Sequence, residues 1–143
     1  MYFDDMVLNQ TYTTPNVTVE EDKMIAFAKE YDPFPLHFDK EYAARTRYGK
    51  LVAPGVMTFM SIWAEVMRLG FLGEELIAGK STKIEWFKPV FAGDTLTGKV
   101  TITRLERRNQ FNGVAELTTD VYNQAGVLVL RDVTESVLKC RGT

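Results

Sequence analysis

Residues 56–69 constrain the fold of this chain more than any other segment. Their sequence, Val-Met-Thr-Phe-Met-Ser-Ile-Trp-Ala-Glu-Val-Met-Arg-Leu, predicts a helix with apolar side chains over almost its whole circumference. A helix that is apolar on most sides has to be buried, so we expect a sheet to wrap around it. Gly70 follows directly and is the expected C-cap, because glycine readily adopts the left-handed conformation that ends helices.

From residue 82 onward, apolar and polar residues alternate with a period of two, which predicts strands. Alternating segments begin near Ile84, Leu96 and Ala115, and a mostly apolar segment covers residues 127–138. Short turn signals that contain glycine separate these segments. Long antiparallel strands that follow one buried helix predict an α+β fold, in which a curved sheet surrounds the helix.

The size of the chain limits how much of this apolar surface one sheet can cover. The 143 residues are the length of a single domain, and 45% of them are hydrophobic. We therefore expect an exposed edge of the sheet that pairs with a second copy, which would give a homodimer or a higher oligomer.

Composition also excludes several classes of partner. The chain has 17 Lys and Arg against 19 Asp and Glu, and no basic run, so we expect no nucleic acid partner. No stretch reaches the about 18 apolar residues of a membrane span, so we expect no membrane partner. The N-terminus lacks the features of a signal peptide and Cys140 is the single cysteine, so a cytoplasmic protein is expected.

Two helix starts are predicted in the first half of the chain. Thr18-Val19-Glu20-Glu21 has the form of a capping box, which predicts a helix from Thr18. Pro33 disfavours helical geometry at the residue before it, so this helix should end near Tyr31. Asp39 is the expected N-cap of a short helix that runs to about residue 45.

The only histidine, His37, marks the expected place for chemistry. It follows Asp32 on a short loop that Pro33 and Pro35 stiffen. An imidazole exchanges protons near neutral pH, and a carboxylate held beside it can complete an acid/base pair. Asp32 and His37 are therefore the candidate catalytic residues.

Three motifs, in this order, resemble those of the MaoC-like dehydratases, the (R)-specific enoyl-CoA hydratase branch of the hotdog superfamily. They are Tyr-Asp-Pro-Phe-Pro-Leu-His-Phe-Asp at 31–39, Leu-Val-Ala-Pro-Gly-Val-Met-Thr at 51–58 and Phe-Lys-Pro-Val-Phe-Ala-Gly-Asp-Thr-Leu at 87–96. The resemblance implies a single hotdog domain over residues 1–143. It implies reversible syn addition of water to a trans-2-enoyl-CoA or enoyl-ACP in fatty acid metabolism. Asp32 and His37 would be the catalytic pair, and the thioester would be a substrate rather than a cofactor, with no metal.

The resemblance also implies substrate contacts around the start of the central helix. The backbone N–H of Gly55, next to Pro54, would donate to the thioester oxygen, because a helix N-terminus has free N–H groups and partial positive charge. Two positions differ from the family pattern. Phe34 replaces an asparagine that braces the loop, and Trp63 stands where hydratases often have a serine that supports the aspartate. Trp63 would also fill space for an acyl chain.

Two other functions remain open from the sequence. An acyl-CoA thioesterase on the same fold would use an acid on the central helix, where Glu65 is the only carboxylate. A non-catalytic acyl-CoA-binding module would explain Phe34 and Trp63. Candidates for binding the phosphates of CoA are Arg45, Arg47 and Lys50, although a solvated charged loop is the simpler interpretation of this cluster.

Overall fold

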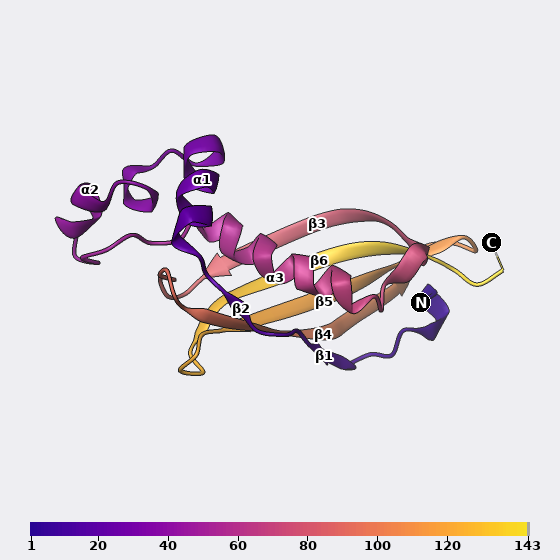
Figure 1. Ribbon diagram of the computed structural model, residues 1–143. Helices are drawn as coiled ribbons and strands as arrows, with labels where there is room; N and C mark the ends of the chain where they lie inside the picture. The colour runs from indigo at the N-terminus through magenta and orange to yellow at the C-terminus, as the bar shows by residue number, and fades with distance from the viewer. Residues whose placement is uncertain (143) are drawn as a thin grey trace.

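The structure, a computed structural model, describes residues 1–142 and contains one curved antiparallel sheet with a long helix along its concave face (Figure 1). The helices are α1 (Glu21–Tyr31), α2 (Lys40–Ala44) and α3 (Gly55–Leu69). The strands are β1 (Thr11–Thr13), β2 (Val17–Thr18), β3 (Leu76–Trp86), β4 (Thr95–Arg107), β5 (Asn112–Tyr122) and β6 (Leu128–Lys139). The α+β class and the four long strands are as predicted.

The strands follow the order β1-β4-β5-β6-β3, and β2 also pairs with β4. In the centre of the sheet, Thr118 of β5 lies opposite Thr101 of β4 and Val133 of β6. β3 pairs with β6 alone among the described strands, so one of its edges is free in the single chain. This confirms the predicted free edge, and its pairing with a second copy stays a prediction.

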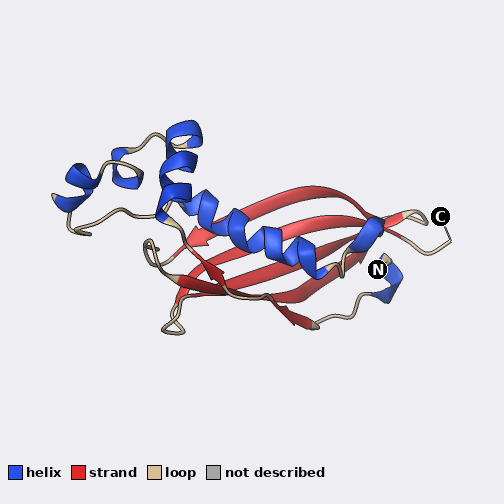
Figure 2. Ribbon diagram, viewed as in Figure 1, coloured by secondary structure: helices blue, strands red, loops and turns tan. Residues whose placement is uncertain are grey.

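α3 lies across the concave face of the sheet (Figure 2). Its buried residues are Thr58, Phe59, Ile62 and Val66. The apolar members pack in one core with strand residues such as Leu117 and Leu130. Each such side chain stabilises the fold by about 1.5–3 kcal/mol. Gly70 ends the helix at a φ of 77°, as predicted.

The prediction that a sheet wraps around this buried helix holds for only one side of α3. Val56 and Met60 are 49% and 46% exposed. They lie one helical turn apart, so they form one exposed strip of the helix. The sheet of a single chain covers only the opposite side.

The predicted start of the first helix is also wrong. Thr18 belongs to β2 and lies opposite Thr95 of β4, and α1 begins at Glu21. Thr18, the first residue of the apparent capping box, is therefore part of a strand rather than a helix cap. Its partner is distant in the sequence, so local sequence does not reveal the pairing. The predicted end of this helix at Tyr31 is confirmed.

α1, α2 and the segment between them project beyond one end of the sheet, and both chain ends lie near the other end (Figure 1). The side chain of Asp39 accepts a hydrogen bond from the backbone N–H of Tyr42 at 3.1 Å, which confirms it as the N-cap of α2. Within residues 1–142, none of the helices has the length and apolar character needed to cross a membrane.

Candidate active site

The end of α1 brings Asp32 and His37 together. Asp32 is the C-cap of α1, and its N–H donates to the carbonyl of Ala28 at 2.9 Å. Pro33 then stops the helix, and a short 3-10 turn at Pro35–His37 follows. As a result, Oδ2 of Asp32 lies 3.3 Å from Nε2 of His37. The local backbone therefore places the two side chains near each other.

The imidazole of His37 has a fixed orientation. Its Nδ1 lies 2.7 Å from the carbonyl oxygen of Val52. Because a carbonyl can only accept a hydrogen bond, Nδ1 carries the hydrogen and donates it. Nε2 is therefore the nitrogen that faces Asp32. The His37 side chain is 11% exposed and that of Asp32 is 48% exposed, so the pair is reached from the Asp32 side.

Phe34 contacts both members of the pair. Its ring meets the imidazole of His37 edge to face, with 5.4 Å between ring centroids. Its backbone N–H donates to the carbonyl of Asp32 at 2.7 Å, and its own carbonyl accepts from the N–H of His37 at 2.9 Å. Phe34 therefore braces the turn through ring packing and backbone bonds, without the side-chain amide of the family pattern.

A cavity of about 790 Å³ connects this pair with the start of α3. Asp32, His37 and Gly55 all line it, so the structure brings together three of the predicted site residues. The N–H of Gly55 lies in the first turn of α3, where a helix has no internal acceptor for it. Thr58, one turn later, also lines the cavity.

Three other predicted site residues, Phe34, Pro54 and Trp63, do not line this cavity. Pro54 is the N-cap of α3, and its carbonyl accepts a hydrogen bond from the hydroxyl of Thr58 at 3.2 Å. The ring of Trp63 stacks on that of Phe59, with centroids 6.0 Å apart.

The basic cluster before α3 divides in the structure. Arg47 lines the cavity, and it donates a hydrogen bond to the hydroxyl of Tyr48 at 3.1 Å. The guanidinium of Arg45 lies over the ring of Tyr42, and neither lines the cavity. The ammonium of Lys50 lies 4.4 Å from the centroid of Phe91, also outside the cavity.

The profile of the MaoC-like domain matches residues 5–123. The chain belongs to the MaoC-like domain family. It is 28% identical over 143 residues to the uncharacterized protein YdeM of Bacillus subtilis (strain 168), and the match covers 97% of this chain and 99% of that protein. It is 32% identical over 123 residues to the (R)-specific enoyl-CoA hydratase of Aeromonas caviae, with 82% of this chain and 83% of that protein covered.

The fold of this MaoC-like domain is also found in solved structures. A structure of a monoamine oxidase regulatory protein from Archaeoglobus fulgidus matches it with a TM-score of 0.92 and 27% identity, over 98% of this chain and 95% of that chain. The common arrangement is the hotdog fold, as the sequence motifs predicted.

Two further residues of the MaoC-like domain line the cavity and were missed by sequence reasoning. Trp86 is the last residue of β3, Lys88 lies two residues later, and both line the cavity. Ile84 and Trp86 alternate with Lys83 and Glu85, a pattern that predicts a strand and no more. Nothing local in the sequence indicates that β3 ends beside the start of α3.

Proposed function

We propose that this MaoC-like domain is a hydratase that adds water reversibly to trans-2-enoyl thioesters. The observation that carries the proposal is the 3.3 Å distance between Asp32 Oδ2 and His37 Nε2, at a cavity that Gly55 also lines. The relative from Aeromonas caviae, named as an (R)-specific enoyl-CoA hydratase, supports this substrate class.

In the forward reaction, Asp32 and the imidazolium of His37 hold one water molecule. Asp32 accepts a proton from the water as the water oxygen forms a bond to C3 of the enoyl group. The electron pair of the C2–C3 double bond moves toward the thioester carbonyl, whose oxygen becomes enolate-like. The N–H of Gly55 donates to this oxygen. Positioned proton transfers of this kind contribute about 10²–10⁴-fold to the rate.

His37 then donates the Nε2 proton to C2, and the thioester carbonyl forms again. Asp32 now holds the proton from water, and Nε2 of His37 has a free lone pair. The two atoms are 3.3 Å apart, so the proton can return from Asp32 to His37 and restore the starting state. The hydrogen bond to Val52 keeps the hydrogen on Nδ1, so Nε2 is the transferring atom in every turnover.

The carrier of the acyl group is CoA or acyl carrier protein, both of which have phosphate groups. Arg47 and Lys88 line the cavity from two segments that are far apart in the sequence. Both side chains are exposed, as binding a mobile phosphate requires. We assign them to the phosphates of the carrier.

The working unit in this proposal is a homodimer. The free edge of β3 exposes Ile77, and the exposed strip of α3 contains Val56 and Met60. Pairing of two β3 strands would cover the open edge, since unpaired strand edges readily bind a second chain. Light scattering coupled to size-exclusion chromatography tests this, with twice the 16.3 kDa chain mass as the expected result.

The activity is tested with crotonyl-CoA and the unmodified protein. Hydration removes the enoyl absorbance without release of a thiol, whereas a thioesterase releases free CoA. A non-catalytic binding module does neither, yet butyryl-CoA still raises its melting temperature. The thioesterase alternative has little support, because Glu65 bonds to Arg68 at 2.7 Å and does not line the cavity.

A further inference from the structure

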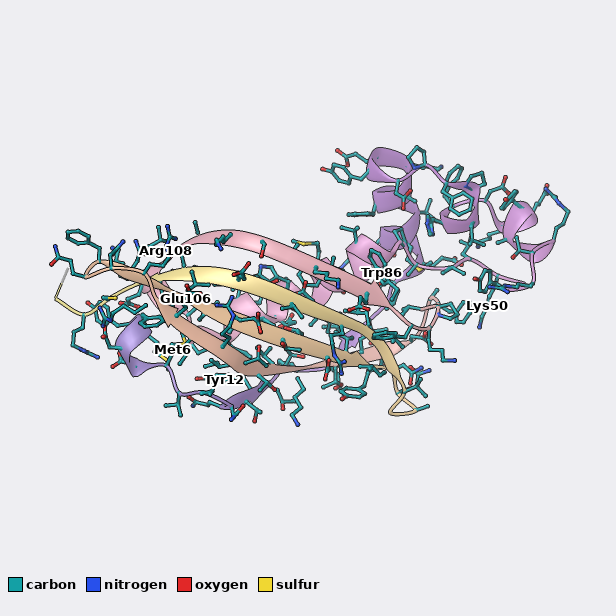
Figure 3. All side chains as sticks on the ribbon, turned by 180° about the vertical axis from the view of Figure 1, so that it is seen from behind. Met6, Tyr12, Lys50, Trp86, Glu106 and Arg108 are labelled. Atoms are coloured by element: carbon teal, nitrogen blue, oxygen red, sulfur yellow. The ribbon has the colours of Figure 1, made fainter. Side chains whose placement is uncertain are left out.

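Trp86 occupies a position in the cavity that the mechanism above does not use. It is the last residue of β3 and lies opposite Leu130 of β6. Figure 3 shows it at the end of the sheet that is nearest to the helical segment. The residue is 50% exposed and lines the cavity with Gly55. Within residues 1–142, its indole N–H has no hydrogen-bond acceptor.

The indole lies directly against Gly55. A Cβ atom placed on Gly55 would lie 2.5 Å from both Nε1 and Cε2 of Trp86, far closer than real contacts allow. The part of the indole around its nitrogen is therefore the part nearest to the start of α3. This contact also explains the glycine, since any side chain at position 55 would displace the ring.

The separation of the two N–H groups follows from this contact. The Cβ position and the amide nitrogen of Gly55 are both attached to the same Cα, about 2.5 Å from one another. The indole nitrogen of Trp86 consequently lies within about 5 Å of the Gly55 nitrogen. Two donors at that separation can both lie about 3 Å from one oxygen atom, which is the geometry of an oxyanion hole.

We propose that the indole N–H of Trp86 is a second hydrogen-bond donor to the thioester oxygen, beside the N–H of Gly55. The inference rests on the proposed hydratase function, because it concerns the oxygen that becomes enolate-like during water addition. A donor whose hydrogen bond strengthens as negative charge develops on the oxygen lowers the activation barrier. An aromatic wall alone stabilises the bound substrate and the transition state equally, so it leaves the barrier unchanged. Trp86 would then be a catalytic residue.

The first test compares Trp86→Phe with Trp86→His in crotonyl-CoA hydration. Phenylalanine keeps an aromatic wall without a donor, and histidine keeps a ring N–H with less apolar surface. We expect Trp86→Phe to lower kcat about 10- to 100-fold, less than the about 10²–10³-fold loss for a fully enclosed donor, because Trp86 is half exposed. The affinity for saturated butyryl-CoA should change much less, and Trp86→His should retain more activity than Trp86→Phe.

A wild-type kcat in Trp86→Phe, or a higher kcat in Trp86→Phe than in Trp86→His, would overturn the donor role while the hydratase function stands. A wild-type protein that hydrates no enoyl-CoA would instead remove the proposed function and this inference with it. The two failures are therefore distinct.

The second test has a readout that is independent of activity. Gly55→Ala should lower the melting temperature in the wild-type background, because the new Cβ overlaps the indole. The same substitution in a Trp86→Ala background should lower it clearly less, since the overlapping ring is absent. Equal decreases in the two backgrounds would contradict the contact on which the donor role depends.

Discussion

The Nδ1–H of His37 donates a hydrogen bond to the backbone carbonyl of Val52, with 2.7 Å between the two heavy atoms. The N–H of Val52 in turn donates to the carbonyl of Leu36 at 3.2 Å. These two bonds join the turn that carries His37 to the loop that leads into α3. Because the N–H of Gly55 begins that helix, the proposed acid and the proposed oxyanion donor share one connected piece of backbone.

Asp32→Asn and His37→Gln should each lower kcat/KM for hydration about 10²–10⁴-fold, because each removes a proton-transfer group. Glutamine at 37 still offers an N–H to the carbonyl of Val52, so the fold should persist. Asp39→Asn is the matched control, since it alters a carboxylate of the same segment and asparagine also caps helices well. Its rate should stay at the wild-type value. Full activity in either site variant would contradict the mechanism.

Phe34→Ala should lower kcat about 10-fold or more, because the imidazole of His37 loses the ring that packs against it at 5.4 Å and a small displacement of a catalytic group is costly. Phe34→Asn should retain more activity, since asparagine can brace the turn by bonding to nearby backbone. Tyr31→Ala removes another exposed ring from this segment and serves as the control. Steady-state kinetics decide, and an unchanged kcat in Phe34→Ala would show that the ring is dispensable.

Arg47→Ala and Lys88→Ala should each raise KM for crotonyl-CoA about 2- to 5-fold, the effect of one exposed charge pair, with little change in kcat. The increase should shrink at high salt, because salt screens exposed charges. Lys99→Ala removes an equal charge from β4 and should leave KM unchanged. An equal change in KM for crotonyl-CoA in all three variants would argue against carrier binding by Arg47 and Lys88.

The buried carboxyl of Asp132 should make the protein less stable as the pH rises, the opposite of the usual effect of a carboxyl group. It is fully buried on β6, and it accepts hydrogen bonds from the hydroxyls of Thr82 and Thr134. Burial raises the pKa of the Asp132 carboxyl above its usual range, and these hydroxyls offset only part of the effect. The folded protein therefore binds this proton more tightly than the unfolded chain does. This contribution to stability is complete below the unfolded-state pKa of about 3.9 and is lost as the pH rises through the folded-state pKa.

Asp132→Asn should accordingly raise the melting temperature at pH 8, by about 2–4 °C for each kcal/mol gained in the free energy of unfolding. This gain should vanish as the pH approaches 4. Asp120→Asn is the control, because Asp120 on the neighbouring strand accepts a hydrogen bond from Arg131 at 2.6 Å and gains nothing from neutralisation. Thermal unfolding of both variants between pH 4 and 8 measures the difference. A stabilisation of Asp132→Asn that does not depend on pH would contradict the assignment.

The parts of the fold that sequence predicted are those with strong local patterns. The apolar helix ends at Gly70 as expected, because the helix period and its terminal glycine are both local signals. The start of α1 was predicted wrongly, since Thr18 pairs with Thr95, which is distant in the sequence. β1 was not predicted, because three residues are too few to show a period.

In the candidate site, too, residues with local sequence signals were predicted and those placed by distant contacts were missed. Asp32 and His37 were identified because one short loop with two prolines holds both, and their side chains lie 3.3 Å apart. The hydrogen bond from His37 to Val52 that orients the imidazole is not local and could not be predicted. Trp86 was missed because its position against Gly55 depends on where β3 ends relative to α3. Pro54 and Trp63 were expected at the cavity and lie outside it, because the direction of a helix face toward a cavity depends on tertiary packing.

The proposed catalytic pair lies on the helical segment that projects beyond the sheet, while β4, β5 and β6 supply much of the core (Figure 1). Substitutions in the projecting segment therefore change the chemistry at little cost to the strands that hold the molecule together. Such a separation favours evolvability. A library confined to the exposed positions among residues 32–54 should yield many folded variants with altered substrate range, because it leaves the buried Leu36, Ala43, Leu51 and Ala53 unchanged.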